Sequence, residues 1–339
     1  MTLPPSQMPT ARPPAQFLMR RGLVTQLFAP EQFCILGNLL DFGERPVIQA
    51  LDDPRLRTVH TLITGWGCPR IGPEELDRMP ALRAIHHAAG TVKEHLDPEV
   101  WHRGIRVTTA AAANAVPVAE YTLAMILLEG KGIPRAAAAH REDPARDLSP
   151  LFESVGNHRR RIGILGASKI GRRVIGLLRG FDFDVAVSDP YLRDDDPIRE
   201  HARVVDLDEL FSNSDIVSVH APLLPETVGL VSRRLLGLMP DGATLINTAR
   251  GRIVDHDALV AEVRAERLRA VLDVTDPEPL PAGHVLLESP SVIVTPHIAG
   301  ALGNELRRLG ESVVAEVRRA ARGETARHAV SLDELAAMA

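Results

Sequence analysis

The feature that most constrains the fold is a glycine-rich turn between two apolar runs, within residues 161–189. The first apolar run, Arg161–Leu165, ends in the turn Gly166–Gly171 (GASKIG), which opens a helical segment. A second apolar run follows and ends at Asp189. This order is typical of a βαβ unit that binds a dinucleotide, with the pyrophosphate at the amino terminus of the helix. The stretch therefore predicts a nucleotide-binding domain built on a parallel sheet.

Four residues of this stretch have separate expected roles. Gly166 permits the tight turn, and Gly171 lets the helix lie close to the strand. Asp189 can accept hydrogen bonds from the adenosine ribose hydroxyls and would repel a 2′-phosphate, which favours NAD over NADP. Ser168 departs from the pattern G-x-G-x-x-G, because it occupies the position of the second glycine. Its hydroxyl is expected either to point away from the phosphates or to donate to a phosphate oxygen.

Composition limits the kinds of partner. The 339 residues carry a formal net charge of −5 and are 45% hydrophobic, which indicates about two globular domains. The basic residues form no stripe, so a nucleic-acid partner is not expected. Cys34 and Cys68 are too few for a disulfide framework or a metal site and suit a reducing cytoplasm. No run of eighteen apolar residues is evident, so no membrane partner is expected. These observations predict a cytoplasmic protein with a small-molecule ligand.

The predicted organisation is α/β, with two domains. Residues 1–16 contain five prolines and are expected to form a disordered tail. Residues 17–115 and 301–339 are expected to form a smaller, flavodoxin-like domain that binds the substrate and is built from both chain ends. Residues 116–300 are expected to form the NAD-binding domain, a Rossmann doubly wound parallel sheet, because near-continuous apolar strands alternate with helices there.

Three connecting segments carry their own expectations. An Ala- and Leu-rich helix over Ala115–Leu128 is expected to link the domains, with Pro117 in its first turn, where a missing N–H costs little. Residues 135–157 are expected to form a partly helical connector on the surface. A long amphipathic helix over residues 304–322 is expected to return the chain to the first domain.

Three further stretches of the second domain follow strand-like runs: NTARG at 247–251, LDVTDPEP at 272–279 and VTPHIAG at 294–300. Together they resemble the D-isomer-specific 2-hydroxyacid dehydrogenase family. The resemblance extends from about residue 59 to about residue 319. It includes the strand end SVHAPL at 218–223 and the loop AAGT at 88–91. His86 and His87, before that loop, depart from the family pattern and leave the substrate identity open.

The resemblance implies an NAD-dependent oxidoreductase that interconverts a 2-oxoacid and a D-2-hydroxyacid by hydride transfer. His297 would be the acid/base, Glu278 would orient it, and Arg250 would bind the substrate carboxylate and carbonyl. Asp273 would hold the nicotinamide carboxamide. The family is usually a homodimer formed through the nucleotide-binding domain. Backbone N–H groups that would bind substrate belong to Ala89, Gly90 and Thr91.

The carboxyl ends of parallel strands form one edge of a sheet, so the three stretches are expected to meet above it. Two alternatives stay open: an NAD(H)-sensing, corepressor-like binding protein, and a dehydrogenase of the same fold for another substrate such as phosphite. No metal ligands are predicted. The complete set of residues expected to contact the cofactor is Gly166, Ser168, Lys169, Ile170, Gly171, Asp189, His220, Ala221, Pro222, Thr227, Thr248, Ala249, Asp273 and His297.

Overall fold

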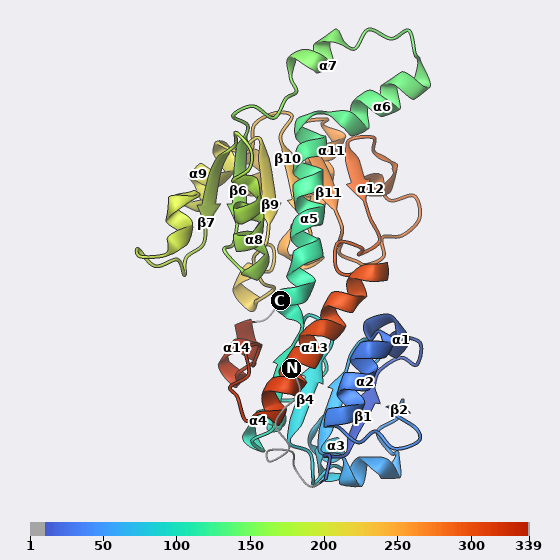
Figure 1. The fold of residues 1–339 in the computed structure, drawn as a ribbon. Helices are drawn as coiled ribbons and strands as arrows, with labels where there is room; N and C mark the ends of the chain where they lie inside the picture. Colours follow the sequence, from blue (N-terminus) through green and yellow to red (C-terminus); the bar gives the residue numbers. More distant parts are fainter. Residues whose placement is uncertain (1–10, 338–339) are drawn as a thin grey trace. The chain divides into compact units, whose positions relative to one another are not determined.

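The structure is a computed structural model, and it describes residues 11–337. Within this range the chain divides into two compact units: residues 11–114 with 301–337, and residues 115–300. Each unit is built on one parallel sheet with helices packed against it (Figure 1). The predicted α/β class is therefore confirmed.

The first unit contains a five-stranded parallel sheet in the order β2-β1-β3-β4-β5. This is the flavodoxin-like order, in which the chain winds outward in both directions from the first strand. The smaller sheet is thus flavodoxin-like, as predicted. Its strands are β1 (Ala15–Leu18), β2 (Val47–Ile48), β3 (Thr61–Thr64), β4 (Ala84–His87) and β5 (Arg106–Thr109).

The amino-terminal boundary of this sheet differs from the prediction. A disordered tail is expected over residues 1–16, and residues 1–10 of it lie outside the described residues. Ala15 and Gln16, however, begin β1, which is buried along its length and pairs with both β2 and β3. The tail prediction is wrong at these two residues. Pro14 directly precedes the strand, and its extended backbone suits strand entry, with its carbonyl accepting the His60 N–H at 2.8 Å.

Helices from both chain ends cover the two faces of the first sheet. One face packs against α1 (Leu23–Leu27), α2 (Pro30–Leu39) and α13 (Leu306–Ala321), whose apolar residues form one core cluster. Since α13 comes from the carboxyl-terminal part of the chain, that part completes the unit. The other face packs against α3 (Pro73–Asp77), α4 (Glu99–His102) and α14 (Leu332–Ala337).

The second unit contains a seven-stranded parallel sheet in the order β12-β11-β10-β9-β6-β7-β8. The chain runs from β6 outward to β8 and then crosses to β9 on the other side of β6. This reversal places a ligand-binding crevice at the carboxyl ends of β6 and β9. The strands are β6 (Arg161–Leu165), β7 (Asp184–Ser188), β8 (Arg203–Val204), β9 (Ile216–Val219), β10 (Thr244–Asn247), β11 (Arg269–Leu272) and β12 (Val292–Val294).

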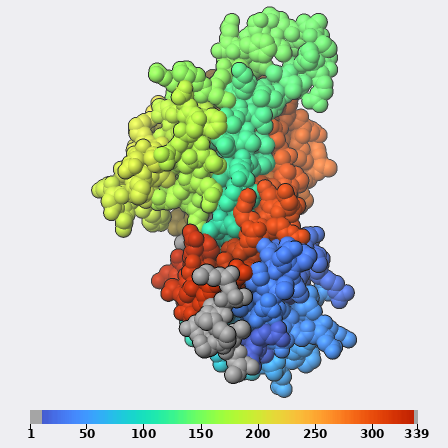
Figure 2. Space-filling model, viewed as in Figure 1, coloured from blue at the N-terminus to red at the C-terminus, as the bar shows by residue number. Residues whose placement is uncertain are grey.

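Helices also lie on both faces of the second sheet. One face packs against α5 (Ala111–Gly130) and α8 (Lys169–Leu178). The other packs against α9 (Leu207–Ser212), α10 (Arg233–Leu238), α11 (His256–Arg264) and α12 (Val285–Glu288). Between α5 and β6, α6 (Ile133–Glu142) and α7 (Ser149–Glu153) form an arm that projects from this unit (Figures 1 and 2).

One prediction about the linking helix is corrected by α5. The helix begins at Ala111, so Pro117 lies inside it and not in its first turn. The start was missed because the alanines at 111–113 extend the helix without a recognisable cap. By length and composition α5 is also apolar enough to cross a membrane, since an 18-residue window of this 20-residue helix has a mean hydropathy of 1.5. The expectation of no membrane partner stays a prediction. Ala119 and Ile126 of α5 are fully buried against the second sheet.

The packing of α13 against α1 gives a stability prediction. Gly310→Ala is expected to lower the free energy of unfolding by about 1–3 kcal/mol, because the added carbon would lie 2.0 Å from the carbonyl oxygen of Leu27. Gly37→Ala in α2 is the matched control, since nothing lies within 4 Å of its added carbon; it should stabilise the helix by about 0.5–1 kcal/mol. Urea unfolding of both variants measures this difference. Equal stabilities would contradict the close approach.

Candidate functional site

The turn between β6 and α8 is packed so closely that two of its residues must be glycine. Gly166 has a φ of +97°, and a Cβ there would lie 2.7 Å from the backbone nitrogen of Ala221. A Cβ on Gly171 would lie 2.1 Å from the carbonyl oxygen of Gly166. The conformational reasons predicted for both glycines are therefore present. They bring the start of α8 against the end of β9.

Ser168 caps α8. Its Oγ accepts a hydrogen bond from the N–H of Gly171 at 3.3 Å, and its φ of −64° needs no glycine. The two orientations expected for this hydroxyl did not include a cap. Within the described chain, the N–H groups of Ser168, Lys169 and Ile170 donate no hydrogen bond. These donors and the positive end of the helix dipole form a cradle that can hold a pyrophosphate.

Asp189 lies just beyond β7, and both of its carboxylate oxygens are held by backbone. Oδ2 accepts from the N–H of Ala167 at 2.7 Å, and Oδ1 accepts from the N–H of Tyr191 at 2.8 Å. Each oxygen keeps further acceptor capacity, so the carboxylate can still receive ribose hydroxyls. Arg172 of α8 forms a bidentate pair with Asp196, at 2.7 and 2.5 Å, which holds the pKa of Asp196 well below its usual range.

The segment after β9 forms the facing wall of the turn. His220 is 3% exposed, and burial lowers its pKa to about 3, so the ring is neutral. Its Nε2 lies 2.9 Å from the Ser218 hydroxyl. Thr227 donates from Oγ1 to the carbonyl of Pro222 at 2.6 Å and accepts from the N–H of Leu224 at 2.7 Å. Its hydroxyl therefore closes this loop, and a cofactor contact from Thr227 stays a prediction.

The turn after β10 is folded by Asn247, which is fully buried. Its Nδ2 donates to the carbonyl of Arg250 at 2.9 Å, and its Oδ1 accepts from the N–H of Ala249 at 3.0 Å. The side chain of Arg250 donates from NH1 to the carbonyl of Ala249 at 2.7 Å. Thr248 lies in the same turn, with its hydroxyl 3.4 Å from that of Thr122. Arg250 thus lies at the carboxyl edge of the second sheet, three residues after the end of β10.

Glu278 and His297 lie together at the same edge. Glu278 follows β11 and His297 follows β12, and these strands are neighbours in the sheet. Oε1 of Glu278 lies 2.7 Å from Nδ1 of His297, with side chains 42% and 52% exposed. Since a carboxylate can only accept, Nδ1 carries the hydrogen. Nε2 has no hydrogen-bond partner among the residues described. The predicted contact between the two side chains is therefore present.

Asp273 is 2% exposed and holds the loop that carries His297. Oδ1 accepts from the Thr295 hydroxyl at 2.6 Å and from the N–H of Ile298 at 2.8 Å, while Oδ2 accepts from the N–H of Ala299 at 2.9 Å. These contacts come from the loop. The contact predicted between Asp273 and the nicotinamide stays a prediction. Sequence reasoning missed Thr295, for which no local pattern signals a partner 22 residues away.

The loop after β4 in the first unit offers backbone donors. In the part of the chain that the structure describes, the N–H groups of Ala89, Gly90 and Thr91 donate no hydrogen bond. Asn114 lies beside them: its Oδ1 accepts from the N–H of Ala301 at 2.9 Å, and its Nδ2 lies 3.6 Å from the position of a Cβ on Gly90. Three successive free donors can bind a carboxylate.

The neighbouring histidines belong to the core of the first sheet. His86 and His87 are almost fully buried and bond through Nδ1 to the hydroxyls of Thr108 and Thr64, each at 2.8 Å. Burial lowers the pKa of His86 to about 4 and that of His87 to about 3. Both rings are neutral at pH 7, so neither supplies a positive charge to the adjoining loop.

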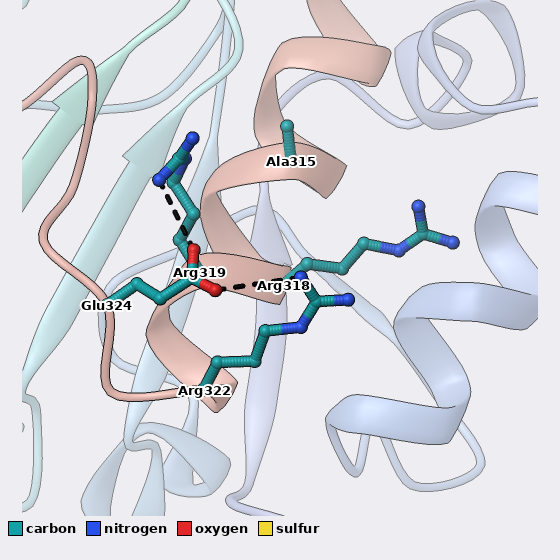
Figure 3. Close-up of a pocket in the computed structure, with 5 residues that line it drawn as sticks. All are labelled: Ala315, Arg318, Arg319, Arg322 and Glu324. Carbon is teal, nitrogen blue, oxygen red and sulfur yellow. Dashed lines mark hydrogen bonds and ion pairs between the residues drawn. The ribbon is translucent and has the colours of Figure 1, made fainter. Parts of the chain in front are cut away.

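A separate hollow of about 220 Å³ lies at the carboxyl end of α13 (Figure 3). Arg319 and Arg322 both pair there with Glu324, at 3.2 and 3.6 Å. Arginines at a helix carboxyl terminus are favoured by the helix dipole. None of the predicted site residues lines this hollow. Among residues 11–337, no group of three or more His, Cys, Asp or Glu residues could hold a metal ion.

Comparison with known proteins agrees with this geometry. Residues 123–299, more than half of the chain, match the model of the D-isomer specific 2-hydroxyacid dehydrogenase NAD-binding domain. A glyoxylate reductase from Thermofilum pendens is 34% identical over 75% of this chain and 76% of its own length. The chain belongs to the D-isomer-specific 2-hydroxyacid dehydrogenase family. It is therefore related to NAD-dependent oxidoreductases, and its second unit is a nicotinamide-dinucleotide-binding domain.

Two further comparisons describe the range of the family. A D-3-phosphoglycerate dehydrogenase from Archaeoglobus fulgidus is 30% identical over 69% of this chain but only 44% of its own length. The chain spans about half the length of such relatives. A 2-hydroxyacid dehydrogenase from Xanthobacter autotrophicus, solved with NADPH, is 25% identical and aligns with a TM-score of 0.72 over 96% of this chain and all of its own.

The cap at Ser168 gives a prediction that separates stability from cofactor binding. Ser168→Ala should lower the free energy of unfolding by about 1 kcal/mol, and Ser168→Gly by only a few tenths. Because the backbone donors remain, NADH affinity should change by no more than about 1.5 kcal/mol in Ser168→Gly. Thermal unfolding and fluorescence titration with NADH measure the two quantities. A loss of affinity beyond a hundredfold would contradict a capping role.

Proposed function

We propose that this chain is an NAD-dependent dehydrogenase that interconverts a 2-oxoacid and a D-2-hydroxyacid. The observation that carries this proposal is the Glu278–His297 pair, at 2.7 Å, on the same sheet edge as the glycine-rich turn. An imidazole held by a carboxylate beside a dinucleotide cradle can donate and accept the proton that accompanies hydride transfer.

His297 is the proposed acid/base. When bound, the nicotinamide supplies the hydride that reaches the carbonyl carbon of the oxoacid. Negative charge then develops on the carbonyl oxygen, and Nε2 of His297 donates a proton to it. Glu278 fixes the ring by accepting from Nδ1 and stabilises the imidazolium before the proton is transferred. In the oxidation direction, neutral Nε2 accepts the proton from the hydroxyl of the D-2-hydroxyacid.

Arg250 and the loop after β4 are the proposed contacts for the carboxylate. A guanidinium can bind a carboxylate and an adjacent carbonyl through two parallel hydrogen bonds, which a lysine cannot reproduce. The free N–H groups of Ala89, Gly90 and Thr91 add donors without a charge of their own. Each of these groups suits a carboxylate, and neither determines the rest of the substrate.

NAD is the proposed cofactor in preference to NADP. The Asp189 carboxylate would meet a 2′-phosphate with repulsion in a partly buried position. Arg172, which lies within electrostatic range of Asp189, is engaged in a bidentate pair with Asp196. The positive charge of Arg172 is therefore already paired with Asp196 and does not favour the 2′-phosphate.

We also propose a cytoplasmic homodimer formed through the second unit. Only a third of the apolar window of α5 is buried within the chain. The adjoining arm leaves Ile133 46% and Phe152 58% exposed, and no residue of α6 is buried. Apolar residues that are half-buried on α5 and exposed on the arm are found in protein interfaces. Sedimentation equilibrium would contradict the homodimer if the protein stayed monomeric at micromolar concentration.

The experiment that tests the proposed reaction is NADH and NADPH turnover with a panel of 2-oxoacids, with phosphite and NAD as a separate arm. Oxidation of NADH by at least one 2-oxoacid, giving the D-product, is expected. Because reduction consumes one proton and oxidation releases one, the equilibrium should move toward the 2-oxoacid as pH rises. Tight NADH binding without turnover would instead favour a cofactor-sensing protein, and turnover of phosphite alone would identify another substrate.

Asp189→Ala is expected to weaken NADH binding and to reduce discrimination against NADPH, because the repulsion of the 2′-phosphate is removed. Asp184→Ala, at the other end of the same strand, is the control and should leave cofactor choice unchanged. The ratio of kcat/KM for NADH to that for NADPH measures the effect. Equal use of both cofactors by the wild type would contradict the assignment of Asp189.

His297→Ala is expected to lower turnover by about 10²–10⁴-fold, the range for a positioned acid/base. His140→Ala, on the exposed face of α6, is the matched control and should retain wild-type turnover. Steady-state kinetics on the best substrate of the panel measure both. Near-normal turnover in His297→Ala would rule out the catalytic assignment.

A further inference from the structure

A chain of three hydrogen-bonded side chains reaches from α5 to the loop that carries His297. The hydroxyl of Tyr121 lies 2.8 Å from that of Thr295, and the Thr295 hydroxyl lies 2.6 Å from Oδ1 of Asp273. All three belong to the second unit. Tyr121 comes from the middle of α5, 174 residues before Thr295. These hydrogen bonds thus connect α5, which covers the sheet, to the edge where the candidate acid/base lies.

The direction of these hydrogen bonds follows from the acceptors. Asp273 receives hydrogen bonds on both carboxylate oxygens, including those from the N–H groups of Ile298 and Ala299. Thr295 has one hydroxyl hydrogen and gives it to this carboxylate, so its oxygen must accept from Tyr121. Burial raises the pKa of Tyr121, which keeps the phenol protonated as a donor. Tyr121 therefore donates to Thr295, and Thr295 donates to Asp273.

The carboxylate at the end of this chain holds the backbone around His297. His297 has a φ of +55°, in the left-handed region that residues other than glycine seldom adopt. Its N–H donates to the carbonyls of Asp273 and Thr295, both at 3.0 Å. The next two N–H groups donate to the carboxylate of Asp273. Three successive backbone donors are thus fixed by Asp273 and Thr295, and a turned carboxylate would release two of them.

We propose that Tyr121 and Thr295 are positioning residues, which orient the Asp273 carboxylate and so hold His297 in its left-handed conformation with Nε2 directed toward the substrate. The inference rests on the proposed function, in which His297 transfers the proton. It adds that the hydroxyls of Tyr121 and Thr295, and not the Asp273 carboxylate alone, determine the position of the His297 ring.

Thr295→Val tests this directly, because it removes the hydroxyl and keeps the shape of the side chain. Turnover should fall by about tenfold to a hundredfold, the loss expected when a catalytic group moves by a fraction of an ångström to 1 Å. The KM for the oxoacid should stay within about threefold, since the proposed carboxylate contacts at Arg250 and the loop after β4 are untouched. Thr295→Ser restores the hydroxyl and should return turnover to within threefold of wild type. Tyr121→Phe should lower turnover less than Thr295→Val.

Thr244→Val is the matched control. Thr244 is fully buried, and its hydroxyl lies 3.4 Å from Glu129 and 3.3 Å from Arg269. It is the first residue of β10, at the opposite edge of the same sheet. This variant should also lose stability but keep turnover. The proposal is overturned if Thr295→Val turns over as fast as Thr244→Val, or if Thr295→Ser is as slow as Thr295→Val.

A second measurement does not depend on turnover. In protein labelled with ¹⁵N-histidine, the ring signals of His297 are assigned by their loss in His297→Ala. They should shift or broaden in Thr295→Val and stay unchanged in Thr244→Val. If the wild type reduces no 2-oxoacid, the proposed function fails, and these signals still decide the positioning role. Unchanged ring signals in Thr295→Val would overturn it.

Discussion

The close contact between the glycine turn and the end of β9 determines where a nucleotide can bind in this protein. A side chain at Gly166 would collide with Ala221, and one at Gly171 would collide with the turn itself. The first turn of α8 therefore lies against the sheet with its N–H groups directed into the crevice between β6 and β9. Every other candidate residue of the second unit lies on the same carboxyl edge, because all seven strands are parallel.

Most polar side chains at this edge act on the backbone. Asn247 folds the turn that carries Arg250, Thr227 closes the loop after His220, and Asp273 holds the segment around His297. Glu278 acts differently, since it contacts the ring of His297 itself. Among the described residues, the groups without a hydrogen-bond partner at this edge include the backbone donors at the start of α8 and Nε2 of His297. Such preorganisation lets the site act without large rearrangement.

The sequence predicted those parts whose signal is local. The run Ile216–Val219 is apolar except for Ser218 and is the strand β9 in the structure. The parallel sheets, the glycine turn and the pairing of Glu278 with His297 were also predicted, because motif spacing and family resemblance carry them. The start of the first sheet was not predicted, because the prolines before Ala15 indicated a tail, whereas the strand there is stabilised by its pairing with β2 and β3.

Other features depend on contacts that no local pattern encodes. The capping role of Ser168 depends on its backbone conformation, and the partners of Asp273 lie 22 to 26 residues away. The neutrality of His86 and His87 comes from burial in the middle of a sheet. For such residues the sequence supplies the side chain, and the tertiary structure supplies its surroundings.

The most direct test of the central claim is a crystal structure of the protein with NAD⁺ and oxamate, an unreactive analogue of a 2-oxoacid. The account predicts the pyrophosphate on the N–H groups of Ser168 to Ile170, the oxamate carboxylate on the guanidinium of Arg250, and Nε2 of His297 within about 2.6–3.2 Å of the oxamate carbonyl oxygen. An oxamate bound away from His297, or a dinucleotide displaced from the glycine turn, would contradict it.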